Sequence, residues 1–339
     1  MRSLVAGGLI LGAVVVLTLV PSMVGGYYLF LLTLAMTSAI FAMSLDLQWG
    51  YAGLINFGAA APFALGAYGY ALVTQTPAFA SAYVAVPVAM LVAAIYGMVV
   101  AFPAFKARTL PLYYALLTLA GTLLLQKVTM ISTFTNGFNG INGVAPLDIS
   151  VPGLFELRII TPRDLYLAVL LTLIATFVFC RWLAGTPAGR VVRALREDER
   201  RCEALGYPVV RYKLFVACGT AALAGLAGAL FAAVNANVTP ALFGVQMSLV
   251  AFIWVALGGP GTLWGPAVAA IVLVMAEGYF SRASGELYLV VISGLFIVGV
   301  LFLPRGLAGL IPTGQRALRR GRESDVSGST VGENNDVRV

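Results

Sequence analysis

Long apolar stretches separated by short polar segments run along almost the whole chain. Ten of them approach or exceed the length of a membrane span: residues 4–24, 27–47, 56–74, 80–102, 110–131, 163–184, 212–235, 246–262, 265–281 and 286–304. A helix of about 20 apolar residues crosses the hydrocarbon core of a bilayer. The pattern therefore predicts an all-α integral membrane protein with about ten transmembrane helices.

Two of these stretches allow a second interpretation. Residues 4–24 follow Met-Arg-Ser as a signal peptide would, but the apolar run is longer than a usual signal core and no A-x-A site follows, which favours a retained span. The joint at 257–266 is rich in glycine and proline, so it is compatible with a loop between two spans or with one broken helix.

Composition narrows the class of protein. Apolar residues make up 60% of the 339 positions, histidine is absent, and the three cysteines (Cys180, Cys202, Cys218) have no CxxC spacing. These features exclude the usual zinc and haem sites and argue against a disulfide framework. No metal site and no catalytic residue are predicted, and no paired carboxylates or nucleophile motif support a membrane enzyme.

The basic residues gather on one side of the predicted spans. With the N-terminus inside, only Lys127, Arg158, Arg163 and Arg282 of the 21 basic residues fall on or near the other side. The positive-inside rule therefore predicts that both termini are cytoplasmic. Because the bases follow topology, the net charge of +7 does not indicate a nucleic-acid partner. Residues 1–311 are predicted to form the transmembrane domain, and the polar tail 312–339 is predicted to be disordered.

The most charged segment is 189–213, GRVVRALREDERRCEALGYPVVRYK, with seven basic and four acidic side chains. Thr186 and Pro187 are typical of a helix start, and Gly206 with Pro208 is typical of a stop. We therefore expect one amphipathic cytoplasmic helix over 187–205, within a loop of about 185–212. The apolar positions of this helix are Val192, Leu195, Cys202 and Leu205.

Two explanations of this helix are open. Its bases would hold the loop inside or rest on anionic lipid headgroups. Alternatively, the helix docks on another protein, which the interspersed acids and the small residues of EALG favour.

Five segments, in order along the chain, resemble the LivM-like permease subunits of ABC importers of the branched-chain amino acid type. They are WGYAGLINFGAAAPFALGAYGYAL at 49–72, YYALLTLAGTLLLQ with TNGFNGING after it, the charged loop with the span that follows it, VALGGPGTLWGPAVAA at 256–270 and FLPRGLAGLI at 302–311. The resemblance covers about residues 27 to 312. It implies a BtuC-like, type II ABC importer permease architecture in the bacterial inner membrane, and a transport subunit rather than an enzyme.

The same resemblance implies how the charged loop is used. In that family the loop corresponds to an EAA-type coupling helix that sits in a groove of the ATP-binding subunit. Here its core would be Glu199, Glu203, Ala204 and Gly206, and its flanking contacts would be Arg193, Arg196 and Arg200. Arg200 and Arg201 occupy places where small residues are common, so either glutamate remains a candidate for the main contact.

The glycine-rich segment after the second predicted span has two interpretations. Gly50, Gly53, Gly58, Gly66 and Gly69 would let helices pack closely, or they would permit unwound backbone beside a substrate path. On the second interpretation Gly53, Asn56 and Gly58 border the translocation path.

Two residues depart from the family pattern close to these glycines. Relatives often carry asparagine at the position of Asp46 and histidine at the position of Ala59. Because Asp46 lies near a predicted cytoplasmic end, we expect its carboxylate to reach water.

The chain contains no GxxxxGK[ST] motif for nucleotide phosphates. The resemblance therefore implies no cofactor in this chain, and ATP with magnesium on two ATP-binding partner subunits. It also implies a second, LivH-like permease and an external or periplasmic substrate-binding protein, with membrane lipid around the spans. The predicted function is a permease subunit of an ATP-driven importer of branched-chain or other amino acids, amides or small organic acids. A stand-alone secondary transporter or channel is the alternative, although the deep spans carry almost no ionisable residues for ion coupling.

Overall fold

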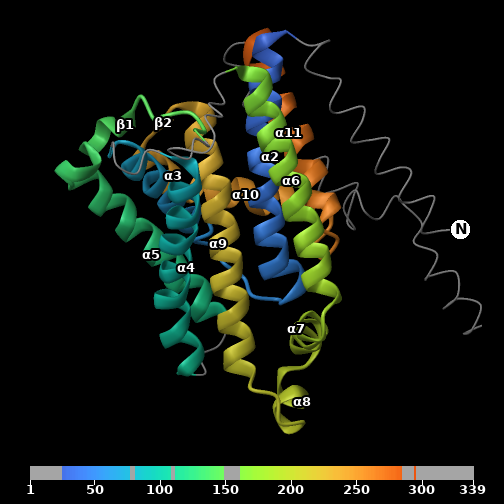
Figure 1. Cartoon of the computed structure of the whole chain (residues 1–339). Coiled ribbons are helices and arrows are strands. Elements are labelled where there is room, and N and C mark those ends of the chain that lie inside the picture. Colours follow the sequence, from blue (N-terminus) through green and yellow to red (C-terminus); the bar gives the residue numbers. More distant parts are fainter. Residues whose placement is uncertain (1–24, 77–80, 108–110, 149–160, 285–293, 295–339) are drawn as a thin grey trace, which may run out of the picture.

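A bundle of helices forms the described part of the chain, which comprises residues 25–76, 81–107, 111–148, 161–284 and 294 of a computed structural model (Figure 1). The α-helices are α2 (Gly26–Leu45), α3 (Ala60–Thr74), α4 (Ala82–Lys106), α5 (Pro111–Ile131), α6 (Pro162–Gly185), α7 (Pro187–Glu197), α8 (Glu199–Ala204), α9 (Val209–Asn235), α10 (Val245–Gly258) and α11 (Trp264–Ser284). A π-helical turn, η1 (Asp46–Tyr51), extends α2. The bundle confirms an all-helical membrane domain.

Six helices in the described residues are long and apolar enough to cross a membrane: α2 with η1, α4, α5, α6, α9 and α11. The predicted spans 56–74 and 246–262 are shorter as helices, because α3 has 15 residues and α10 has 14. Glycine and proline at 258–261 end α10, so the joint at 257–266 is a loop between two helices. The predicted spans 4–24 and 286–304 and the tail lie outside the described residues, apart from Gly294. The structure therefore supports a multi-pass membrane protein with at least these six spans.

Two helices form the centre of the bundle. In their most apolar windows, 78% of the α2 and η1 residues and 61% of the α9 residues are buried, against 22–28% for α4, α5, α6 and α11. Gly66 of α3 lies directly against Gly225 of α9, so the two backbones approach closely, as small residues permit in membranes. The outer helices keep apolar side chains exposed, which is favourable only against lipid or another subunit.

The two ends of the bundle differ. One end, here called the strand end, carries the 3-10 turns η3 (Thr133–Thr135) and η4 (Gly137–Asn139) and a short antiparallel pair of β1 (Ile141–Asn142) and β2 (Asn237–Val238) (Figure 1). A further 3-10 turn, η5 (Pro240–Phe243), precedes α10. The described part of the connection between α5 and α6 therefore carries short regular elements. The opposite end, here called the loop end, carries α7 and α8.

The charged loop forms two helices, so the prediction of a single helix over 187–205 is wrong. Thr186 begins α7 as expected, accepting the Gly189 N–H on its side chain at 3.2 Å. Asp198 then adopts an extended conformation (φ −155°) and accepts the Arg201 N–H at 3.0 Å, which caps α8. This side-chain cap competes with helix continuation because it satisfies the N–H groups of a new first turn. Gly206, at φ +84°, follows the end of α8 as the sequence indicates.

Candidate functional site

The centre of the site is a break in regular structure between α2 and α3. After η1 the backbone is non-helical until α3 begins at Ala60. Its polar groups are nevertheless bonded within the protein: Gly53 N–H donates to the Trp49 carbonyl at 3.0 Å, and Leu54 N–H donates to the Gln48 carbonyl at 2.9 Å. Irregular backbone at membrane depth requires such internal partners.

Asp46 is completely buried at the start of this break. Its two carboxylate oxygens accept N–H groups from Gly261 at 2.6 Å and from Leu263 at 2.8 Å. Both donors belong to residues 259–263, here called the α10–α11 loop. The expectation that Asp46 reaches water is therefore wrong, because this loop folds over the carboxylate and its N–H groups take the place of water.

Gly50 permits this close arrangement. A Cβ at this position would lie 2.0 Å from Oδ1 of Asp46 and 2.3 Å from the backbone nitrogen of Gly261. Any other residue would therefore push the α10–α11 loop away from Asp46. The glycine-rich sequence after α2 thus has a specific use at this position.

Two arginines of α7 contact the same region. The Arg196 guanidinium donates a hydrogen bond to the carbonyl of Gly50. The Arg193 guanidinium lies 4.8 Å from the ring centre of Tyr51 and donates to the Ala184 carbonyl, at the end of α6, at 3.0 Å. Both residues were expected to flank a partner contact, and the structure places their charged groups against the membrane domain of their own chain.

The α8 residues lie farther out, at the loop end. Glu199 forms an ion pair with Lys213 of α9 at 2.6 Å. The other predicted contact residues (Arg200, Glu203, Ala204 and Gly206) are all exposed. The structure thus separates the predicted set into an inner pair on α7 and an outer group on α8.

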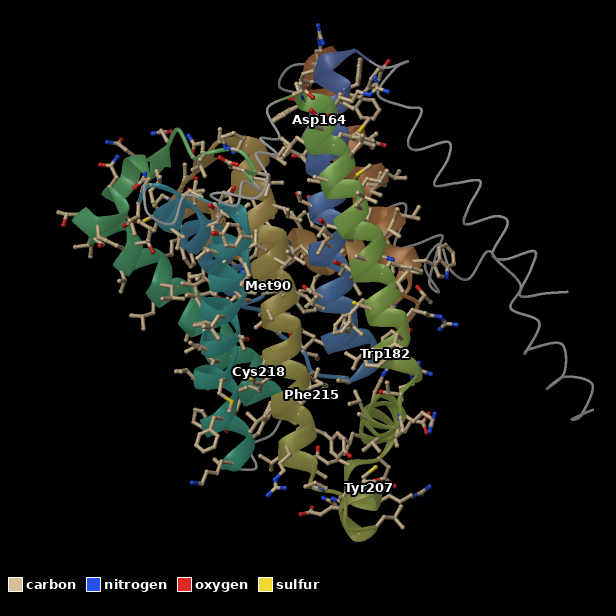
Figure 2. The ribbon with its side chains drawn as sticks, in the orientation of Figure 1. Met90, Asp164, Trp182, Tyr207, Phe215 and Cys218 are labelled. Atoms are coloured by element: carbon tan, nitrogen blue, oxygen red, sulfur yellow. The ribbon has the colours of Figure 1, made fainter. Side chains whose placement is uncertain are left out.

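An apolar tip completes the outer group. Leu205 is 72% exposed and Tyr207 is 43% exposed, whereas Val192, Leu195 and Cys202 are buried as the sequence predicts. Figure 2 shows Tyr207 at the loop end. Leu205 was expected on the buried face, but α8 ends at this residue and its side chain is exposed instead. We call Ala204, Leu205, Gly206 and Tyr207 the α8 tip. The signal in the sequence was an apolar and an aromatic residue on either side of a helix-ending glycine in a polar loop.

Asn56 and Gly58 lie together against α5. The Asn56 amide donates to Oε1 of Gln48 at 2.9 Å and accepts the Gly58 N–H at 2.9 Å. Gln48 donates to the Tyr114 hydroxyl at 2.7 Å, and Thr122 donates to the Gly58 carbonyl at 3.1 Å. This buried polar chain holds the non-helical segment in place.

Gly53 lies apart from that pair. It has φ +71°, and a Cβ would lie 2.9 Å from Cγ of Arg196. The structure therefore places Gly53 beside α7, while Gly66 and Gly69 pack between helices. Gly66 and Gly69 therefore fit the helix-packing interpretation, Gly53 and Gly58 lie in unwound backbone, and the substrate path beside them stays a prediction.

An apolar cavity of about 230 Å³ lies beside α7. Its walls come from η1 and from α4, α6, α7 and α9, and they include Tyr51, Met90, Leu183, Val192, Phe215 and Val216. Figure 2 shows Met90 and Phe215 along this part of the bundle. The cavity leaves space between α7 and the membrane helices.

Within the described residues, no group of three or more His, Cys, Asp or Glu side chains is placed to hold a metal ion. Asp46, the one fully buried carboxylate among them, has both oxygens occupied by backbone N–H groups. The chemistry of this site is therefore hydrogen bonding and packing.

Comparison with known proteins places the chain in a family. The family model described as "Branched-chain amino acid transport system / permease component" matches residues 27–301. The "High-affinity branched-chain amino acid transport system permease protein LivM" of Escherichia coli is 31% identical over 311 residues, which cover 85% of this chain and 71% of that protein. A "Probable branched-chain amino acid transport permease protein LivM" of Methanocaldococcus jannaschii is 26% identical over 70% of this chain and 76% of its own length.

The same comparison reaches a second kind of permease. The LivH permease protein of Salmonella typhimurium is 24% identical over 82% of this chain and 92% of its own length. No solved structure matches the chain. These matches support a permease and lend no support to the stand-alone transporter or channel. The chain is a LivM-like member of the branched-chain amino acid transport permease family.

Proposed function

We propose that this permease subunit imports branched-chain amino acids and is driven by ATP hydrolysis on two partner subunits. The α8 tip is the observation that carries the mechanism. It exposes an apolar surface at the loop end, on a short helix held beside α7, which itself bonds to the membrane domain. Exposed apolar residues that are surrounded by charged residues are typical of a surface that contacts another protein.

The α8 tip and its surroundings form the ATPase contact in this proposal. Leu205 and Tyr207 enter the partner groove, with Ala204 and Gly206 allowing close approach, and Arg200 and Glu203 contact its rim. Glu199 contributes through its ion pair with Lys213, which fixes α8 on α9. Arg193 and Arg196 act from the inner side, where they attach α7 to the membrane domain.

The remaining partners follow from the two ends and the outer faces. The basic loop end faces the cytoplasm of a bacterium, beneath the inner membrane, and the partner ATPases hold ATP with magnesium there. The strand end faces a soluble substrate-binding protein. A LivH-like permease covers part of the exposed apolar surface of the outer helices, which gives a heterodimeric membrane core. The similarity of this chain to LivH proteins supports such a pair, because the two permeases then share one fold.

The path for the solute borders the non-helical segment after η1. Gly53, Asn56 and Gly58 lie in this segment, and unwound backbone in transporters is found where it lines a cavity or is covered by protein. ATP-driven closure of the partner subunits displaces α8 and α7, and the segment changes position with them. A ligand shifts such an equilibrium only by binding its two states differently, so ATP must favour one arrangement of the loop end.

The experiment uses the full complex, purified with its ATPases, second permease and binding protein in proteoliposomes. Leu205→Asp places a charge in the proposed contact, so the ATPases should no longer co-purify and ATP-driven uptake of leucine should be lost. Phe138→Asp is the matched control, because Phe138 is 76% exposed at the strand end. It should leave ATPase co-purification unchanged.

Three results would contradict the proposal. Retention of the ATPases by Leu205→Asp would remove the α8 tip from the interface. Uptake by the chain alone, driven by an ion gradient, would favour a secondary transporter. Uptake of amides or organic acids in place of leucine would refute the assigned substrate.

A further inference from the structure

We propose that Asp46 and Arg196 are positioning residues that link α7 to the α10–α11 loop. Through this link, movement of α7 and α8 reaches α11 as well as α2. This inference rests on the proposed function, because it requires α7 and α8 to receive the movement of the ATPases. It goes beyond that function by naming the contacts that pass the movement on. We call Asp46, Gly50, Arg196, Gly261 and Leu263 the Asp46 junction.

The junction joins three parts of the chain that are far apart in sequence. Arg196 of α7 donates to the carbonyl of Gly50 in η1. Four residues before Gly50, Asp46 accepts two N–H groups of the α10–α11 loop, 215 and 217 residues further along the chain. A Cβ on Gly261 would lie 3.5 Å from Nη1 of Arg196, so the guanidinium also lies beside the loop itself. A displacement of α7 is therefore applied to η1 and to the loop at once.

Burial makes the link between Asp46 and the loop hard to break. When a fully buried carboxylate loses its hydrogen-bond donors, the protein is destabilised much more than when an exposed carboxylate exchanges its donors for water. Asp46 is 0% exposed, and both of its carboxylate oxygens accept N–H groups of the α10–α11 loop. The loop and η1 therefore move as one body, while the helices around them rearrange.

The surroundings of the junction allow such a movement. The cavity of about 230 Å³ lies against Tyr51 and Val192, between α7 and the membrane helices. Interdigitated side chains would resist displacement, whereas a cavity gives α7 space on this side. The α10–α11 loop ends directly at the first turn of α11, so the movement is delivered to the end of a spanning helix.

A purely structural clamp is the competing explanation. It predicts that loss of the junction lowers the amount of assembled complex and leaves the ATP cost of each transported molecule unchanged. A coupling element predicts the opposite: assembly persists, ATP is still hydrolysed, and more ATP is consumed for each molecule imported.

The test compares four variants in the complete complex, with leucine as the solute. Asp46→Ala removes both acceptors, and Asp46→Asn keeps one of them. Arg196→Ala removes the hydrogen-bond donor to the Gly50 carbonyl, whereas Arg196→Lys keeps a charged donor at this position. Ser44→Ala is the control in α2, because Ser44 is buried and, within the part of the chain that the structure describes, its hydroxyl bonds only to the Phe41 carbonyl of its own helix. Arg190→Ala is the control in α7, because the Arg190 guanidinium bonds, among the described residues, only to the nearby Gly185 carbonyl.

We expect the alanine variants at 46 and 196 to raise the ATP hydrolysed per leucine imported about fivefold or more, the lower end of usual coupling between sites. ATPase co-purification and basal hydrolysis should stay within about twofold of the unaltered complex, since coupling and assembly are separate here. The asparagine and lysine variants should recover part of the coupling, and both controls should match the unaltered complex.

An unchanged ATP-to-leucine ratio in Asp46→Ala and Arg196→Ala would overturn the inference. If Asp46→Ala does not assemble, the exposed Arg196 decides the question, and normal coupling in Arg196→Ala overturns the inference equally. Failure of the proposed function has a different signature: Leu205→Asp would then keep its ATPases, or the unaltered complex would show no ATP-driven uptake.

Discussion

Replacing Gly50 by alanine tests the Asp46 junction through stability. The added methyl group would lie 2.0 Å from a carboxylate oxygen of Asp46 and 2.3 Å from the Gly261 nitrogen, both far inside ordinary contact distance. Relief requires the α10–α11 loop to move away, which breaks the hydrogen bond from Gly261 to Asp46. A bond to a charged group contributes about 1.5–3 kcal/mol, and overpacking costs about 1–3 kcal/mol. We therefore expect Gly50→Ala to lower the free energy of unfolding by about 4 kcal/mol.

Gly219→Ala is the matched control for this substitution. Gly219 lies within α9, and a Cβ there would meet no atom within 4 Å. Alanine is favoured over glycine inside a helix by about 0.5–1 kcal/mol, so this variant should be as stable as the unaltered chain or slightly more stable.

The assay is the apparent melting temperature of the complex in detergent, measured at one scan rate because unfolding of such proteins is irreversible. At about 2–4 °C per kcal/mol, Gly50→Ala should melt about 10 °C below Gly219→Ala. Melting of the two variants within about 2 °C of each other would refute the argument that Gly50 is required by the contact between Asp46 and Gly261.

Two further substitutions separate folding from function. Asn56→Ala leaves Oε1 of Gln48 and the Gly58 N–H without their hydrogen bonds, so the free energy of unfolding should fall by about 2–4 kcal/mol and the melting temperature should fall with it. Asn139→Ala, at an exposed position, is the control and should have little effect. Equal melting of the two variants would contradict this role of Asn56. Glu199→Gln removes an ion pair in which the Glu199 side chain is 47% exposed, so the free energy of unfolding should change by less than about 1 kcal/mol. With stability unchanged, weaker ATPase co-purification would report the partner contact. A large loss of stability would show instead that the ion pair holds α8 in place.

Local patterns in the sequence identified the helices and their ends. Apolar length alone located α2, α4, α5, α6, α9 and α11, because a helix in lipid satisfies its own backbone and needs only apolar side chains. Thr186 and Gly206 marked the limits of the charged loop, because a cap depends on the few residues next to it. The ordered glycine-rich segments also indicated the family that the comparisons show.

Tertiary structure decided the contacts on which the proposed function rests. Asp46 is an acidic residue near a helix end, and only the folding of the α10–α11 loop over it turns it into a buried acceptor. Arg193 and Arg196 have the composition of a surface contact, yet the position of α7 directs them to η1 and α6. Leu205, at the end of α8, is exposed although its helical periodicity places it on the same face as the buried Cys202. Each outcome depends on which groups compete for a hydrogen bond or for burial. The hydrogen-bond partners in the Asp46 junction are about 150 to 220 positions apart, so they meet only in the folded chain.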